Sequence, residues 1–154
     1  MKLFLLTLSL LILSVGCTSK TIKKKREYSS YFNKEYLQTL DFSKSKQDLL
    51  TTYIDNSWYY VRRDGKAIPV MQGDDGKADK FKEGLARIKI NGKFGFFNKT
   101  LDIILNPIYD FAFPFHNGIA EVCLGCQEIE EDGQTILDGG SWKRINRRGL
   151  ILEE

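Results

Sequence analysis

The chain has 154 residues, with 23 Lys and Arg against 20 Asp and Glu, so its formal net charge at pH 7 is +3. Residues 17–57 hold eight basic and five acidic residues, whereas residues 58–154 hold fourteen and fifteen. The larger part therefore lacks the excess of positive charge that binds phosphate backbones, and we expect no nucleic-acid partner.

Motifs of enzymes are also missing from the sequence. It contains none of the local signatures of P-loop proteins, zinc proteases, serine hydrolases or dinucleotide-binding folds, and His116 is its only histidine. We therefore expect a protein that is not an enzyme and that uses no cofactor and no metal ion.

Residues 1–16 are predicted to be a signal peptide. Lys2 gives a positive start, and residues 3–15 form a mostly apolar run. As a helix this run would span roughly 20 Å, which is short of the roughly 30 Å hydrocarbon core of a bilayer. The run therefore suits a cleaved signal better than a membrane-spanning helix.

The residues that follow carry a second signal. Ser14, Val15 and Gly16 lead into Cys17, and this arrangement resembles the lipobox of bacterial lipoproteins. The resemblance implies cleavage before Cys17 and acylation of that cysteine, by palmitate among other fatty acids. The alternative is a plain secretory signal that is cut near Gly16 and leaves Cys17 as an unpaired thiol.

Lipidation at Cys17 predicts where the protein resides. Several acyl chains hold a protein stably on a membrane, because each buried CH₂ contributes about 0.8 kcal/mol. We expect an extracytoplasmic protein of the cell envelope that is anchored to a membrane by its lipid. Thr18 follows the cysteine where an Asp would imply retention in the inner membrane, so the outer membrane is expected in a cell with two membranes.

Residues 17–57 are predicted to form a lipidated tether with short helical or disordered segments. The tether begins with a basic run at residues 20–26, which either stays solvated or touches anionic head groups. Apolar residues at 31–40 and again at 49–54 recur with the spacing of short amphipathic helices. We expect both stripes to cover an exposed end of the repeat array that follows, with partner binding as the alternative.

Residues 58–154 contain a repeated pattern. Trp58, Phe94 and Trp142 begin segments that align without a gap, each with further apolar residues, a polar turn and a closing apolar pair. A second shared block begins at Phe81 and recurs at Phe115. Trp142 follows Phe94 at a longer interval than Phe94 follows Trp58, so the third unit carries an insertion, which lies between residues 122 and 139.

The central unit predicts a β-hairpin. Residues 85–90 alternate as a half-buried strand does, Asn91 and Gly92 form the preferred two-residue turn, and residues 93–97 supply the returning strand. Because such hairpins recur, the expected fold is all-β: an array of antiparallel β-hairpin repeats with units at about 58–84, 85–118 and 119–154.

These blocks resemble the WG (KWG) repeat family. The central unit carries the resemblance through Phe81, Glu83, Gly84, Leu85, Ala86, Asn91, Gly92, Lys93, Gly95, Pro107, Tyr109 and Asp110. The residues that define the repeat are Trp58, Phe94, Gly95, Trp142, Gly84 and Gly118. Phe94 stands in place of the family's tryptophan, and Leu101 replaces the turn glycine that is present at Gly65 and Gly149.

The aromatic residues that start each aligned segment have two interpretations. Trp58, Phe94 and Trp142 can pack on the hairpin of a neighbouring unit, since no single hairpin buries its own apolar face. They can instead form a ladder that binds a glycan or a peptide. We expect packing, because aromatic residues in strands are usually packed.

Cys123 and Cys126 open the predicted insertion and have three interpretations. They form a local disulfide, remain free structural thiols, or serve a zinc or redox site. A disulfide requires a turn at residues 124–125, because residues three apart in a straight strand are about 10 Å apart. We expect the disulfide, because zinc usually takes four ligands and the sequence offers no second Cys pair.

The sequence therefore predicts a non-enzymatic interaction module on a lipid anchor, with a protein or a cell-envelope polymer as partner. A thiol-redox or zinc-binding protein that uses Cys123 and Cys126 is the alternative.

Overall fold

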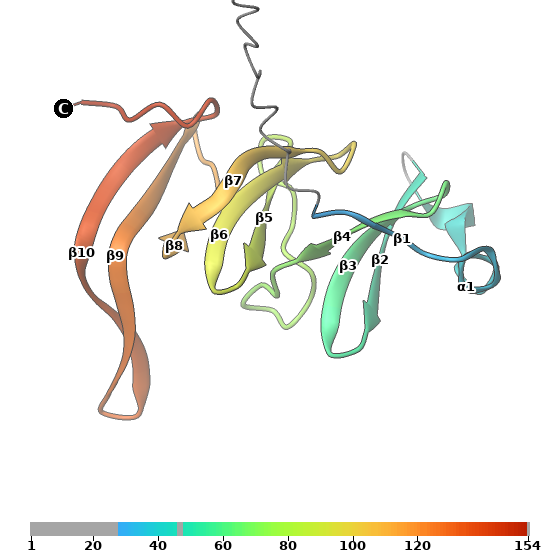
Figure 1. The fold of residues 1–154 in the computed structure, drawn as a ribbon, viewed down its shortest axis with the longest axis horizontal. Helices are drawn as coiled ribbons and strands as arrows, with labels where there is room; N and C mark the ends of the chain where they lie inside the picture. Colours follow the sequence, from blue (N-terminus) through green and yellow to red (C-terminus); the bar gives the residue numbers. More distant parts are fainter. Residues whose placement is uncertain (1–27, 46–47, 154) are drawn as a thin grey trace, which may run out of the picture.

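A computed structural model describes residues 28–45 and 48–153. In chain order the elements are β1 (Ser30–Tyr31), α1 (Lys34–Gln38), a 3-10 turn (Phe42–Lys44), β2 (Leu49–Ile54), β3 (Ser57–Arg62), β4 (Lys66–Val70), β5 (Leu85–Ile90), β6 (Lys93–Asn98), β7 (Ile103–Tyr109), β8 (Phe111–Ala112), β9 (Ile119–Glu131) and β10 (Gln134–Asn146). Figure 1 shows three small sheets that follow one another across the molecule in chain order. The predicted all-β array of antiparallel hairpins is confirmed.

Each sheet is built on one hairpin, and we call the sheets units 1, 2 and 3. Unit 1 has the strand order β1-β4-β3-β2, unit 2 has β5-β6-β7, and unit 3 has β10-β9-β8. The hairpins β2–β3, β5–β6 and β9–β10 turn at residues 55–56, 91–92 and 132–133, and both residues of every turn have positive φ. This is the turn whose twist matches the twist of paired strands, which explains the recurrence of Asn, Asp and Gly there.

The insertion of the third unit lengthens both strands of its hairpin. In unit 2, β5 and β6 have 6 residues each, whereas in unit 3 β9 and β10 have 13 each. The two strands of the third hairpin are thus extended equally, and they stay in register as far as the turn. We call the extension at residues 124–141 the arm; in Figure 1 the ends of β9 and β10 project beyond the other two sheets.

The hydrophobic core lies between the units. One cluster joins units 1 and 2 through residues that include Ile68, Ile88 and Phe97. Another joins units 2 and 3 through residues that include Phe96 and Val122. Each hairpin therefore buries its faces only by lying against its neighbours, as the repeat pattern predicted.

Residues before Trp58 close the first end of the array. Phe32, Leu37 and Leu40 pack against the cluster of Phe42, Val61 and Ala67 under unit 1. Asn33 caps α1, because its side chain accepts a hydrogen bond from the N–H of Tyr36 at 2.8 Å. The predicted covering role of the stripe at 31–40 is confirmed.

The second predicted helix, at 49–54, is wrong. These residues form β2 and pair with β3 from Leu49 opposite Arg62 to Ile54 opposite Ser57. Leu49 packs against the cluster between units 1 and 2, and Leu50 packs against the cluster under unit 1. Leu49 and Leu50 pack on different clusters and Tyr53 is 51% exposed, so the apolar residues of this strand do not alternate, and their spacing resembles that of a helix. Unit 1 thus begins within the segment that was predicted to be a tether.

Candidate binding face of the last repeat

The three residues that start the aligned segments occupy equivalent places in β3, β6 and β10 but differ in burial. Trp58 is partly buried against the cluster between units 1 and 2, and Phe94 is 2% exposed. Trp142 is 43% exposed. Packing is confirmed for the first two and is wrong for Trp142, because no further unit of the described chain lies against the outer face of unit 3.

Backbone conformation or close packing explains why glycine stands at these repeat positions. Gly84 and Gly118 adopt φ of 84° and 78°, which favours glycine. A Cβ atom on Gly95 would lie 2.5 Å from the carbonyl oxygen of Leu105, because β7 crosses close to β6 there. The corresponding residue in unit 3 is Lys143.

Trp142 belongs to an exposed aromatic cluster that reaches into the core. Its ring stacks on Phe113 with centroids 5.8 Å apart and planes inclined by 27°. Phe111 contacts both rings at 6.1 and 5.0 Å and meets Phe94 of unit 2 at 5.2 Å. Phe113 is 45% exposed. A fixed aromatic surface therefore faces solvent at the end of the array.

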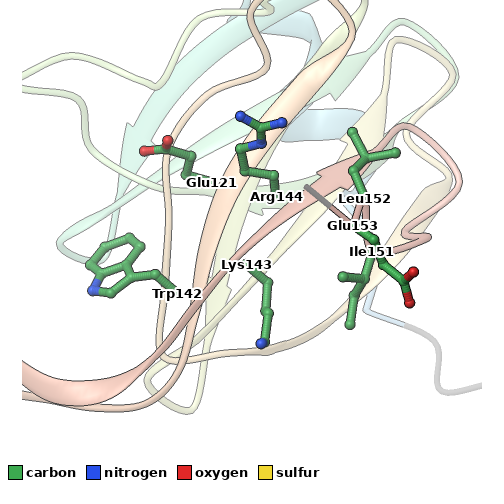
Figure 2. Close-up of a pocket in the computed structure, with 7 residues that line it drawn as sticks. All are labelled: Glu121, Trp142, Lys143, Arg144, Ile151, Leu152 and Glu153. Carbon is green, nitrogen blue, oxygen red and sulfur yellow. The ribbon is translucent and has the colours of Figure 1, made fainter.

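Charged residues flank this aromatic surface. Arg144 lies opposite Glu121 in the pairing of β10 with β9, and both residues are exposed. A hollow of about 530 Å³ is lined by Glu121, Trp142, Lys143, Arg144, Ile151, Leu152 and Glu153. Figure 2 shows Glu121 and Arg144 near each other, with Trp142 at one end of the hollow and residues 151–153 at the other. Such a surface can bind a partner through stacking and hydrogen bonds.

The hollow lies beside an open strand edge. Residues 150–152 run antiparallel to β10, with the N–H of Leu152 donating to the carbonyl oxygen of Arg144 at 2.8 Å and the N–H of Asn146 donating to that of Leu150 at 3.0 Å. In the described chain, no strand lies on that side of β10 from Gln134 to Lys143. The face thus offers backbone as well as side-chain groups.

Comparison with family models identifies the repeated blocks. The model described as WG containing repeat matches residues 76–94 and 94–125. Residues 76–125 therefore carry WG repeats. Comparison with curated proteins gives no match, and comparison with solved structures gives none.

The cysteine pair lies where the arm leaves the last WG repeat. Cys123 and Cys126 form a disulfide pair in β9, with Cα atoms 5.9 Å apart, and Gly125 between them has φ of 81°. The expected turn at 124–125 is therefore present. The two cysteines are 0% and 6% exposed, and a Cβ on Gly140 of the facing strand would lie 2.8 Å from both sulfurs.

Groups that could hold a metal ion do not gather in the described part of the chain. No set of three or more His, Cys, Asp or Glu side chains lies in a suitable arrangement within residues 28–45 and 48–153. The disulfide pair joins two residues of β9 at the base of the arm.

The lipidation site Cys17 lies outside the described residues, as do the signal peptide and the basic run. Within the described residues no helix is long and apolar enough to cross a bilayer.

Sequence reasoning missed two members of the exposed face and one internal pair. Arg144 replaces Phe96 of the central WG repeat in the aligned segments, and this exchange was a readable sign of a solvent-facing position. Phe113 gave no such sign. The buried pair of Asp79 and Arg87 was also missed, because Asp79 lies outside the shared blocks of the repeat and nothing local links it to Arg87.

This ion pair fixes the junction of the WG repeats. Arg87 donates from Nε and Nη2 to the carboxylate of Asp79 at 3.0 and 2.8 Å, and from Nη1 to the carbonyl oxygen of Ala112 in unit 3 at 3.0 Å. The Tyr60 hydroxyl of unit 1 donates to the carbonyl oxygen of Asp79 at 3.0 Å. Burial, with the nearby Asp79 charge, raises the pKa of Tyr60 to about 12. All three units therefore meet at one satisfied polar site.

Proposed function

We propose that this protein is a lipid-anchored, extracytoplasmic interaction module that binds a protein or a polymer of the cell envelope and performs no catalysis. The binding surface is the outer face of unit 3. The observation that carries this proposal is the exposure of Trp142 and Phe113, since the equivalent face of unit 2 is buried against the next unit. Aromatic and arginine residues on an open face are typical of interaction sites.

The anchor in this proposal rests on the sequence. A short apolar run ends at Cys17, and a basic run follows it. In a cell with two membranes the protein resides on the outer membrane, since Thr18 follows the cysteine. The residues between Cys17 and Tyr28 then separate the folded repeats from the lipid.

The alternative function, thiol redox chemistry or zinc binding at Cys123 and Cys126, has less support. Both residues are almost completely buried, and a reactive thiol pair requires access to its partner. The pair lies within a strand rather than at the N-terminus of a helix, where thiolates are stabilised.

Site-specific photo-crosslinking in intact cells tests the binding face. A photoreactive residue replaces Phe113, and the matched control replaces Lys99, an exposed residue of the turn between β6 and β7. We expect a discrete adduct with envelope protein or polymer from position 113 and none from position 99. Equal labelling from both positions, or none from either, would contradict the proposed binding face.

Fractionation tests the anchor separately. Cys17→Ser should move the protein from the membrane fraction to the soluble fraction, and the mass of the mature wild-type N-terminus should show acyl chains on Cys17. An unmodified N-terminus at residue 17 would show a plain secretory signal instead.

A further inference from the structure

The arm of unit 3 presents an unpaired strand edge. β10 is the outermost strand of its sheet, and residues 150–152 cover only residues 144–146 on its outer side. From Gln134 to Lys143 the described chain adds no strand beside it. Such an edge is a template for pairing with another extended segment, and proteins usually shorten, cover or charge it.

The charge of the arm is entirely negative. Residues 124–141 contain no Lys or Arg and five acidic residues, namely Glu128, Glu130, Glu131, Asp132 and Asp138. Within the described residues one ion pair reaches the arm, between Lys89 Nζ and Glu128 Oε1 at 3.2 Å, and both side chains are more than one third exposed. The arm therefore keeps most of its negative charge.

This charge decides which occupant the edge accepts. Asp138 lies on β10, whereas Glu128, Glu130 and Glu131 lie on β9, one strand further from the edge, and Asp132 lies in the turn. If two copies paired through β10, two arms with five carboxylates each would come side by side, and their like charges would repel. A strand rich in Lys and Arg would instead bring opposite charge next to Asp138 and close to the other carboxylates of the arm. The edge thus resists self-association and favours a cationic partner.

The aromatic cluster lies where the edge opens. Trp142 is the second residue of β10 beyond Arg144, which is the last one covered by the segment 150–152. An added strand would continue the line of that segment and would bring one of its side chains onto the exposed Trp142 ring. Tryptophan is the best aromatic acceptor for a Lys or Arg cation.

We propose that the open edge of β10 binds an extended, Lys- and Arg-rich segment of a partner protein by strand addition, with Trp142 as its anchor. This rests on the proposed function and names its partner class. The arm is preorganised for strand addition, because the disulfide pair and Gly140 fix its base and the two-residue turn at 132–133 fixes its tip. Less conformational entropy is then lost on binding.

Three blocked eight-residue peptides test the inference on the purified full chain in a nonionic detergent. They are four repeats of Lys-Thr, the same Lys-Thr peptide with every backbone amide N-methylated, and four repeats of Glu-Thr. Binding is measured by calorimetry and by tryptophan fluorescence in a Trp58→Phe background, where Trp142 is the only tryptophan. We expect the Lys-Thr peptide to bind at least about tenfold more tightly than both others, because the N-methylated peptide has the same charge and side chains but lacks the backbone donors.

Equal binding of the Lys-Thr peptide and its N-methylated form would overturn strand addition, since charge alone would then explain the attraction. Stronger binding of the Glu-Thr peptide would overturn the charge preference. Added salt should weaken binding of the Lys-Thr peptide, because solvent-exposed charges are screened.

Variants locate the site. Glu130→Gln with Glu131→Gln should weaken binding of the Lys-Thr peptide severalfold, and Trp142→Ala should weaken it about tenfold. The matched control, Glu35→Gln with Asp74→Asn, removes two exposed carboxylates elsewhere and should leave binding unchanged. An equal loss in the control would contradict this location, and urea unfolding confirms that each variant is folded.

Different experimental results would contradict the strand-addition inference and the proposed function. If no peptide binds while position 113 still forms its adduct in cells, the face binds a partner of another chemistry and the strand-addition inference is wrong. If the adduct is also missing, both proposals fail.

Discussion

The outer faces of units 2 and 3 are built from equivalent positions, but the face of unit 2 is buried and that of unit 3 is exposed. On unit 2 the face carries Phe94, Phe96 and Leu105, which are at most 8% exposed because unit 3 packs on them. On unit 3 the corresponding residues are Trp142, Arg144 and Glu153, and all three are exposed.

This difference shows how an uncovered repeat face stays compatible with water. Two of the three apolar positions are charged in unit 3, which suits a face that no further unit of the described residues covers. The remaining aromatic residue, Trp142, stays exposed and stacks on Phe113. The same hairpin thus serves as a packing surface in unit 2 and as the proposed binding surface in unit 3.

The largest expected contrast is between the two aromatic residues of this pair of faces. Phe94→Ala should lower the free energy of unfolding by about 3–5 kcal/mol, because it leaves a cavity between units. Trp142→Ala should cost less than about 1 kcal/mol, since the ring is half exposed. Urea unfolding of both variants checks this, and similar losses would show that unit 3 is covered in solution.

A second contrast concerns Arg87 and Glu121, which is its counterpart in the block that begins at Phe115. Arg87→Ala leaves the buried Asp79 carboxylate without its ionic partner and should lower the free energy of unfolding by about 3–5 kcal/mol. Glu121→Ala should change the free energy of unfolding by at most about 0.5 kcal/mol. Chemical denaturation measures both. A small effect of Arg87→Ala, with Asp79→Ala equally mild, would mean that the pair is hydrated.

The disulfide pair should have a smaller and more local effect. It closes a very short loop, so its loss in a Cys123→Ala and Cys126→Ala double variant should cost about 2 kcal/mol. Amides of the arm should then exchange hydrogen faster, while those of β5 and β6 keep their protection. Unchanged exchange in the arm would show that Gly125 and Gly140 hold its base without the bond.

The weakest expected effect is a pH dependence of the contact between units 2 and 3. Glu83 accepts hydrogen bonds from Arg147 Nη2 and from the N–H of Gly118, both at 2.9 Å, and these lower the pKa of Glu83. Because the folded pKa is the lower one, the contribution is complete above the ordinary glutamate pKa of about 4.5 and is lost as the pH falls through the folded value.

Urea midpoints measured between pH 7 and pH 3 check this dependence. Glu83→Gln should fall less steeply than the wild type below about pH 4.5, and Arg147→Gln should flatten the curve in the same direction. The double variant should add nothing to Glu83→Gln. Additive effects would show that the two side chains act independently.

Much of the fold was readable because its signals are local. The Asn-Gly turn at residues 91–92 predicted the central hairpin, and the unequal spacing of the repeats placed the insertion inside the third unit. The strand at 49–54 was misread, because Leu49 and Leu50 are adjacent apolar residues that pack on different clusters, which removes the alternation that marks a strand. The exposure of Trp142 was also misread, since the sequence pattern is the same whether or not a neighbour covers the residue.

The sequence by itself determined the hairpins, their repetition and the need for a turn between Cys123 and Cys126, because each depends on the backbone preferences of a few adjacent residues. Only the tertiary structure decided which repeated faces are buried, that Asp79 and Arg87 join the three units, and that β10 keeps an open edge. Those properties depend on which segments come to lie side by side, and residues far apart in the chain decide that together.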